Sequence, residues 1–241
     1  MRLRFVWLGA AAAGILVWMA SPELRWPARA LAAVLLGPAP IVFMLQASAA
    51  DTLPRPLPRV PIYVGTMLGL WLIGLLALGA GALSGFTTRL MGLVPMQTNQ
   101  FVVWTAFGLL ASAAIVALFK AFGFRDSALM REIVPVTPRE KGLFVGLSVS
   151  AGVCEEMAFR GFLLPALMVA TGSLAGGVVL SSLAFGVLHA HQRAGGALRA
   201  ALLGAALAVP LIVTGSVFAS MAAHVIVDVV GGLWLARWLF R

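Results

Sequence analysis

The sequence of 241 residues has little charge and only one cysteine. Charged residues make up 10% of the chain and hydrophobic residues 61%, a balance that is too apolar for an ordinary soluble domain. Cys154 has no second cysteine to pair with, so an intramolecular disulfide is excluded. No internal repeat is present. This composition indicates a polytopic membrane protein without a soluble domain.

Eight apolar stretches approach the length of about 20 residues that a transmembrane helix needs. We expect one integrated membrane domain, with helices one to four in residues 1–136 and helices five to eight in residues 137–241. Gly81 and Gly85, four residues apart, have the spacing that lets helices pack closely. The sequence predicts an all-α bundle with about eight spans, at residues 5–20, 30–50, 61–84, 101–122, 142–170, 174–192, 197–214 and 216–238.

The basic residues are distributed unevenly between the two sides of these spans. Thirteen of the 17 Lys and Arg lie in or close to the termini and even-numbered loops, three lie in the odd-numbered loops, and Arg160 lies deep within a span. Because basic residues concentrate in cytoplasmic loops, both termini are predicted to be cytoplasmic, in a bacterial inner membrane. The net charge of +9 therefore needs no nucleic-acid partner. Residues 5–20, which follow Arg2 and Arg4, could alternatively be a cleaved signal peptide.

Two carboxylates and a guanidinium lie together in the apolar stretch 142–170. Glu155, Glu156 and Arg160 would each cost about 2.5–3.5 kcal/mol to insert into a bilayer on their own. Such a cluster indicates either a buried ion cluster or a functional site. The later stretches add the remaining ionisable residues near membrane depth, which are His189, His224 and Asp228. Their concentration in the C-terminal half favours a site.

Helical spacing separates the roles of these residues. Glu156 and Arg160 are four apart, so they share a helix face and can pair, whereas Glu155 points about 100° away. A carboxylate near a histidine can take a proton from water, and a second histidine can stabilise an oxyanion, which suits amide hydrolysis. The same groups could instead bind a divalent metal such as zinc. Two more pairs have the four-residue spacing, Phe185 with His189 and His224 with Asp228, so Asp228 can touch or orient His224.

Three short motifs occur in order on three of the predicted spans: Glu155-Glu156-x-x-x-Arg160, Phe185-x-x-x-His189 and His224-x-x-x-Asp228. Together they resemble the signature of the CPBP intramembrane proteases, which include the CAAX prenyl endopeptidases and the bacteriocin-processing and immunity proteins of the Abi group. The segments Thr137-Pro-Arg-Glu-Lys141 and Phe159-Arg-Gly-Phe162 are similar to that family as well. The resemblance covers about residues 137–232.

The resemblance implies a role for each matched residue. Glu155 and His189 would activate the attacking water, and His224 with residue 228 would stabilise the oxyanion. The family often has Asn at the last position, whereas an ionised Asp228 only accepts hydrogen bonds and would repel an oxyanion. Asp228 is therefore expected to orient His224, to be protonated, or to ligate a metal together with the other three. The supporting residues would be Glu156, Arg160 and Phe185.

These observations predict an intramembrane endopeptidase that acts on a membrane-associated peptide or protein at the lipid bilayer. Residues 142–149 would lie partly at the membrane interface, and the cavity would open to the cytoplasm. An alternative is a non-enzymatic scaffold or immunity protein that binds a partner through the same polar cavity. A transporter is disfavoured, because the sequence shows no paired halves with matching broken helices.

Overall fold

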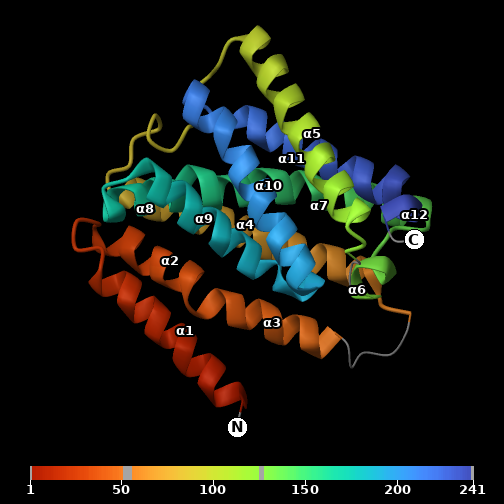
Figure 1. The fold of residues 1–241 in the computed structure, drawn as a ribbon, viewed down its shortest axis with the longest axis horizontal. Helices are drawn as coiled ribbons and strands as arrows, with labels where there is room; N and C mark the ends of the chain where they lie inside the picture. Colours follow the sequence, from red (N-terminus) through yellow and green to blue (C-terminus); the bar gives the residue numbers. More distant parts are fainter. Residues whose placement is uncertain (1, 51–55, 125–127, 240–241) are drawn as a thin grey trace.

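The computed structural model describes residues 2–50, 56–124 and 128–239, and all regular structure in these residues is helical, as predicted (Figure 1). In chain order the elements are α1 Arg2–Met19, α2 Trp26–Leu36, α3 Pro38–Ala50, α4 Arg59–Leu83, α5 Thr98–Ala121, α6 Ala128–Glu132, α7 Pro138–Glu156, η1 Met157–Leu163, α8 Leu164–Thr171, α9 Leu174–Leu188, η2 Ala190–Gln192, α10 Arg193–Thr214, α11 Phe218–Val230, η3 Gly231–Leu235 and α12 Ala236–Leu239.

Each predicted apolar stretch coincides with helix in the structure. The predicted span 30–50 begins earlier, at Trp26, because Pro27 sits in the first helical turn, where its missing N–H costs nothing. It is interrupted at Gly37, after which Pro38 opens α3. The number of spans and the side of the termini stay predictions. Among the described residues, six helical segments are long and apolar enough to cross a membrane: Trp26–Leu45, Arg59–Leu83, Thr98–Ala121, Pro138–Thr171, Ala190–Thr214 and Phe218–Leu235.

The helices surround a core formed mainly by the C-terminal half. α4 packs on α7, α11 packs on α7 and α5, and α10 packs on α9 and α5. α1, α2 and α3 run along one side, drawn in red and orange in Figure 1, where α3 contacts α9. The main apolar cluster joins α2 and α4 to η1, α8 and α9, and its large side chains include Leu35, Phe159, Phe162, Leu163, Leu167 and Phe185.

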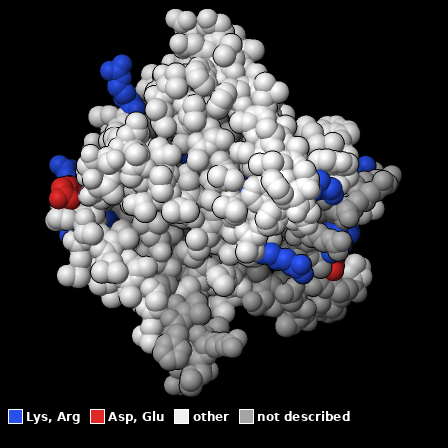
Figure 2. Space-filling view, in the orientation of Figure 1, with Lys and Arg blue, Asp and Glu red and all other residues white. Residues whose placement is uncertain are grey.

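The outside of the bundle is apolar over much of its area. Leu68, Leu72 and Leu110 are between 60% and 72% exposed, as side chains facing lipid can be. Figure 2 shows a face that is largely uncharged, with its visible charged side chains mostly toward the left and right margins. An exposed apolar surface of this extent fits an integral membrane protein and would be unfavourable in water.

Three connecting segments meet at one end of the bundle. Arg59, at the start of α4, donates from Nε to the carbonyl oxygen of Glu132 at 2.7 Å, and its Nη1 lies 3.6 Å from Glu140 Oε1. Lys120, in the last turn of α5, donates to the carbonyl oxygen of Trp238 at 2.6 Å. These segments include even-numbered connections and the C-terminal region that the charge distribution places on one side of the membrane.

A capping box fixes the start of α7, the helix that carries the glutamates. The Thr137 hydroxyl accepts from the Glu140 N–H at 3.2 Å, and Glu140 Oε2 accepts from the Thr137 N–H at 3.0 Å. Pro138 occupies the first turn. α7 therefore begins at Pro138 and not at residue 142, and with η1 and α8 it forms one continuous helical segment as far as Thr171.

Only one member of the predicted packing pair Gly81 and Gly85 packs against another helix: a Cβ atom at Gly81 would lie 3.7 Å from Cδ2 of Phe162 in η1. Gly85 lies in the turn after α4 with φ +82°, a backbone conformation that favours glycine. Close helix packing also occurs between α7 and α11 at Gly152. A Cβ atom at Gly152 would lie 2.9 Å from the Val225 amide nitrogen and 3.1 Å from the Met221 carbonyl oxygen. This glycine lets α11 approach α7 beside the glutamates.

We expect Gly152→Ala to destabilise the protein, because the added methyl group meets the α11 backbone, which cannot rotate away. The loss should be about 1–3 kcal/mol, as for other overpacked sites, and thermal unfolding in detergent would measure it. Gly142→Ala on the same helix is the matched control, since nothing lies within 4 Å of a Cβ atom there. Equal stability of the two variants would contradict the close α7–α11 packing.

Candidate active site

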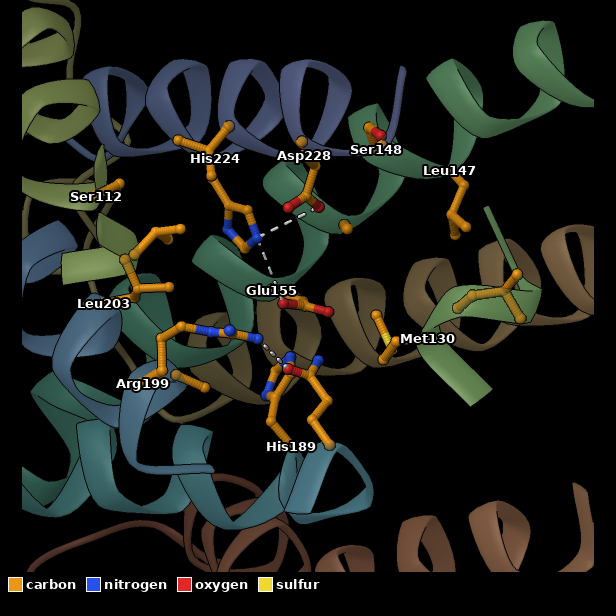
Figure 3. A pocket seen from close by; sticks show the side chains of 18 of the residues that line it. Ser112, Met130, Leu147, Ser148, Glu155, His189, Arg199, Leu203, His224 and Asp228 are labelled. Atoms are coloured by element: carbon orange, nitrogen blue, oxygen red, sulfur yellow. Dashed lines mark hydrogen bonds and ion pairs between the residues drawn. The ribbon is translucent and has the colours of Figure 1, made fainter. Parts of the chain in front are cut away.

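A cavity of about 330 Å³ lies between α4, α5, α7, α10 and α11 (Figure 3). Most of its wall is apolar. All four residues predicted to be catalytic line it, each from the segment that the sequence analysis assigned. The ionisable residues of the wall are Glu155, His189, Arg199, His224 and Asp228. The structure therefore brings the three predicted motifs to one enclosed space.

The two glutamates have different environments, as their spacing predicts. The Glu156 side chain is fully buried, and its Oε1 lies 3.0 Å from Nη1 of Arg160, which confirms the predicted pair. The Glu155 side chain keeps 19% of its surface exposed and faces the cavity. Glu155 is thus the glutamate that a substrate or a water molecule can reach.

Arg160 connects the glutamate pair to two other helices. Its Nη2 donates to the carbonyl oxygen of Gly204 on α10 at 3.0 Å. Its guanidinium lies 4.7 Å from the centre of the Phe185 ring on α9, a cation–π contact. Since Arg160 is only 2% exposed, its charge is neutralised entirely by neighbours inside the protein.

Glu156, and not Asp228, makes the hydrogen bond that orients His224. The imidazole Nδ1–H donates to Glu156 Oε1 at 2.8 Å. The opposite nitrogen, Nε2, points to the cavity and lies 3.7 Å from Asp228 Oδ2 and 3.8 Å from Glu155 Oε2. Asp228 is therefore near the ring but beyond hydrogen-bond length. Glu156 holds two partners, Arg160 and His224, with one carboxylate oxygen.

His189 lies just after the last residue of α9, and a backbone carbonyl group orients its ring. Its Nδ1 is 2.8 Å from the carbonyl oxygen of Phe185, and because a carbonyl only accepts, Nδ1 carries the hydrogen. In the neutral ring, Nε2 is then an acceptor. The Phe185 ring packs 4.5 Å from the His189 ring and 6.3 Å from the His224 ring. The Phe185 ring thus lies beside both histidines, and its supporting role stays a prediction.

The helix changes geometry where the first motif lies. α7 ends at Glu156 and continues as the π-helix η1, which contains Arg160. π-Turns inside α-helices occur frequently at functional sites. Regular α-helical spacing does not predict this turn, but the pair of Glu156 and Arg160 that it predicts is formed.

The metal alternative can be tested against the arrangement of donors. Among the described residues, no three His, Cys, Asp or Glu side chains lie in a group that could hold one metal ion. The residues Glu155, His189, His224 and Asp228 as they stand here do not fit a zinc site, which requires at least three converging protein ligands.

Some residues of the cavity wall belong to none of the three motifs. Arg199 was predicted only as a basic residue near the cytoplasmic end of a span, and the structure places it on α10 in the cavity wall. There its Nη2 donates to Gln192 Oε1 at 3.3 Å. Ser112 on α5 lines the cavity as well. The only sequence signal for Arg199 is a charge at the start of an apolar helix, and Ser112 has none.

We expect Arg160→Leu to destabilise the protein strongly, because it leaves the buried Glu156 carboxylate without its cation. Breaking one partner of a buried ion pair costs about 3–5 kcal/mol. Arg89→Leu is the control, since this arginine is exposed, and it should change stability by less than about 0.5 kcal/mol. Thermal unfolding in detergent compares the two. A small effect of Arg160→Leu would show that the pair is not needed to neutralise Glu156.

Comparison with known proteins gives one family match. Residues 138–230 match the family model described as type II CAAX prenyl endopeptidase Rce1-like. No curated protein and no solved structure matches the chain. The matched segment runs from the capping box of α7 to the end of α11, so it contains all three motifs. An Rce1-like segment implies a CAAX-type protease, and with the apolar helices it implies an integral membrane protein. Through residues 138–230, the resemblance of this chain to the CPBP family is confirmed.

Proposed function

We propose that this protein is an intramembrane endopeptidase that hydrolyses a peptide bond in a membrane-associated peptide or protein with a water molecule activated by Glu155 and His189. One observation carries the proposal: Glu155, His189 and His224 line the same cavity inside the helix bundle, although they come from three separate segments. The family match over the same segments supports the reaction type.

Glu155 serves as the general base in this proposal. Its carboxylate faces the cavity, and the 3.8 Å between its Oε2 and His224 Nε2 leaves the two groups apart and both available. The attacking water transfers a proton to Glu155 while its oxygen bonds to the substrate carbonyl carbon. His189 presents an acceptor at Nε2 when neutral, because its Nδ1–H is held by the Phe185 carbonyl. It can therefore accept the second hydrogen bond that orients this water.

His224 serves as the donor for the oxyanion. With Nδ1–H held by Glu156 at 2.8 Å, its remaining nitrogen, Nε2, faces the cavity. When this nitrogen is protonated, it donates to the negative oxygen that forms as the carbonyl is attacked. Collapse of the intermediate breaks the C–N bond, and the proton on Glu155 moves to the leaving amine. The products are a carboxylic acid and an amine, and Glu155 is ionised again. The acid then passes its proton to the amine, which gives a carboxylate and an ammonium group.

The cavity lies at the end of the bundle where the even-numbered connections meet. Met130, Ile133 and Val134 from the segment before α7 and Gln192 from the segment before α10 form part of its wall. The distribution of basic residues assigns these segments to the cytoplasmic side. We therefore propose that the cavity opens to the cytoplasm, in a bacterial inner membrane.

We expect Glu155→Gln to lower the rate of peptide cleavage by at least about 100-fold, because the amide cannot take the proton of water. The assay uses purified protein in liposomes and a fluorescent prenylated peptide that ends in a CAAX sequence. His189→Gln and His224→Gln should also lose most activity. His191→Gln is the matched control, since His191 bonds the backbone of Leu188 and is not among the residues lining the cavity.

Full activity in the Glu155, His189 and His224 variants would overturn the proposal. If all three bind the peptide and the wild type does not cleave it, the chain is a binding protein of the scaffold or immunity type. Thermal unfolding of each variant in detergent is measured in parallel, so that loss of folding is not mistaken for loss of chemistry.

Asp228→Asn is expected to keep cleavage within about threefold of the wild type, a change of about 0.7 kcal/mol. Glu156 already orients His224, and the asparagine amide can donate a hydrogen bond, which an ionised aspartate cannot. A 100-fold loss would instead assign Asp228 a role that needs its carboxylate. The assay is the same peptide cleavage, with kcat and KM measured separately.

We expect peptide cleavage to survive removal of divalent metals, because the donors around the cavity do not converge into a metal site. Activity is measured before and after dialysis against 1,10-phenanthroline, and the metal content of the protein is measured on the same samples. Stoichiometric zinc that is lost together with activity, and restored together with it, would contradict the metal-free mechanism.

A further inference from the structure

One residue of the cavity wall on α5 has a buried hydroxyl group with no partner among the described residues. Ser112 is 1% exposed and is one of the residues that line the cavity. Its Oγ has no hydrogen-bond partner among the described residues. A hydroxyl buried in this way is unfavourable unless something else satisfies it. The hydroxyl of Ser148, also in the cavity wall, instead donates to the Phe144 carbonyl oxygen at 3.0 Å.

Close packing between α5 and α11 fixes the position of Ser112. At Gly108, one turn before Ser112, a Cβ atom would lie 2.7 Å from Cβ of Ala223 and 3.3 Å from Cδ2 of Leu207. Ala223 immediately precedes His224 in α11. Because residues four apart share a helix face, Ser112 is held on the face of α5 that meets α10 and α11. Figure 3 shows Ser112 and Leu203 in the part of the cavity wall on the far side of His224 from Asp228.

We propose that Ser112 is a substrate-positioning residue, whose hydroxyl hydrogen-bonds the backbone of the peptide that occupies the cavity. A peptide backbone supplies both kinds of partner, a carbonyl oxygen that accepts from the hydroxyl and an N–H that donates to it. The other residues of this part of the wall, Val116, Leu203 and Leu207, are apolar. The Ser112 hydroxyl is therefore the group there that can fix the position of the substrate backbone by a hydrogen bond. Ser112 lies outside the matched segment 138–230, which gives the N-terminal half a direct part in binding.

This inference rests on the proposed function, because the ligand is the peptide substrate of that reaction. Ser112 takes no part in the bond changes. It acts on the scissile carbonyl only through the position of the substrate. The expected effect is therefore on KM more than on kcat, as for a contact made equally in the ground state and the transition state.

We expect Ser112→Ala to raise KM for the prenylated CAAX peptide by about three- to tenfold, the effect of one hydrogen bond, with kcat within twofold. Thermal stability in detergent should not fall, because no hydrogen bond within the described protein is lost. Ser112→Thr keeps the hydroxyl and should recover KM. Thr105→Val is the matched control: Thr105 is also on α5, is buried and has no partner, but it is not among the cavity residues.

Three outcomes would overturn the proposal: no change of KM in Ser112→Ala, an equal change in Thr105→Val, or no recovery in Ser112→Thr. Binding of the same peptide by fluorescence anisotropy, in proteins that also carry Glu155→Gln, separates this test from that of the reaction. If the chain cleaves nothing, a weaker Kd for Ser112→Ala still supports positioning. An unchanged Kd shows that the hydroxyl contacts only water.

Discussion

A carboxylate with no exposed surface must be neutralised by its neighbours, and the arrangement of this site depends on how Glu156 meets that requirement. Arg160 and His224 approach the same oxygen of Glu156, at 3.0 Å and 2.8 Å. Arg160 in turn holds the α10 backbone and the Phe185 ring. One buried charge thus ties η1, α9, α10 and α11 together, which leaves Glu155 on the adjacent face free to point into the cavity. Removing a charge in such a group leaves another buried without compensation.

Much of the fold could be predicted from hydropathy alone, because a bilayer demands long apolar helices with their hydrogen bonds satisfied internally. The positions of the helix ends could be predicted less well from the sequence. The start of α7 at Pro138 depends on a capping box in polar sequence. Pro27 and Pro38 lie at the starts of α2 and α3, where one unbroken span was predicted at residues 30–50. The Gly81–Gly85 spacing was misleading, because spacing cannot show which glycine faces a neighbouring helix.

In the candidate site, contacts between residues close in sequence could be predicted, and contacts between separate helices could not. The pair of Glu156 and Arg160 could be predicted because both lie on one helical segment. The bond from His224 to Glu156 could not, since it depends on how α11 is rotated against α7, which the packing at Gly152 decides. Ser112 and Arg199 have no motif, and only the assembled bundle shows them in the cavity wall. The residues proposed for the reaction can thus be predicted from the sequence, whereas the residues of the wall that would surround the substrate cannot.

Because Met157–Leu163 forms the π-helix η1, the geometry of the site depends on the number of residues in this segment. A π-turn accommodates one residue more than an α-helix would over the same rise, and each residue of an α-helix turns it by about 100°. Deleting one residue of Met157–Leu163 would let the segment become regular α-helix and would move the side chains within it, Arg160 among them, around the helix axis. α8 packs on α9, which carries Phe185 and leads into His189. Evolution can therefore exchange side chains in this segment more easily than it can shorten or lengthen it, so relatives that keep the same chemistry should preserve the number of residues from Glu155 to α9.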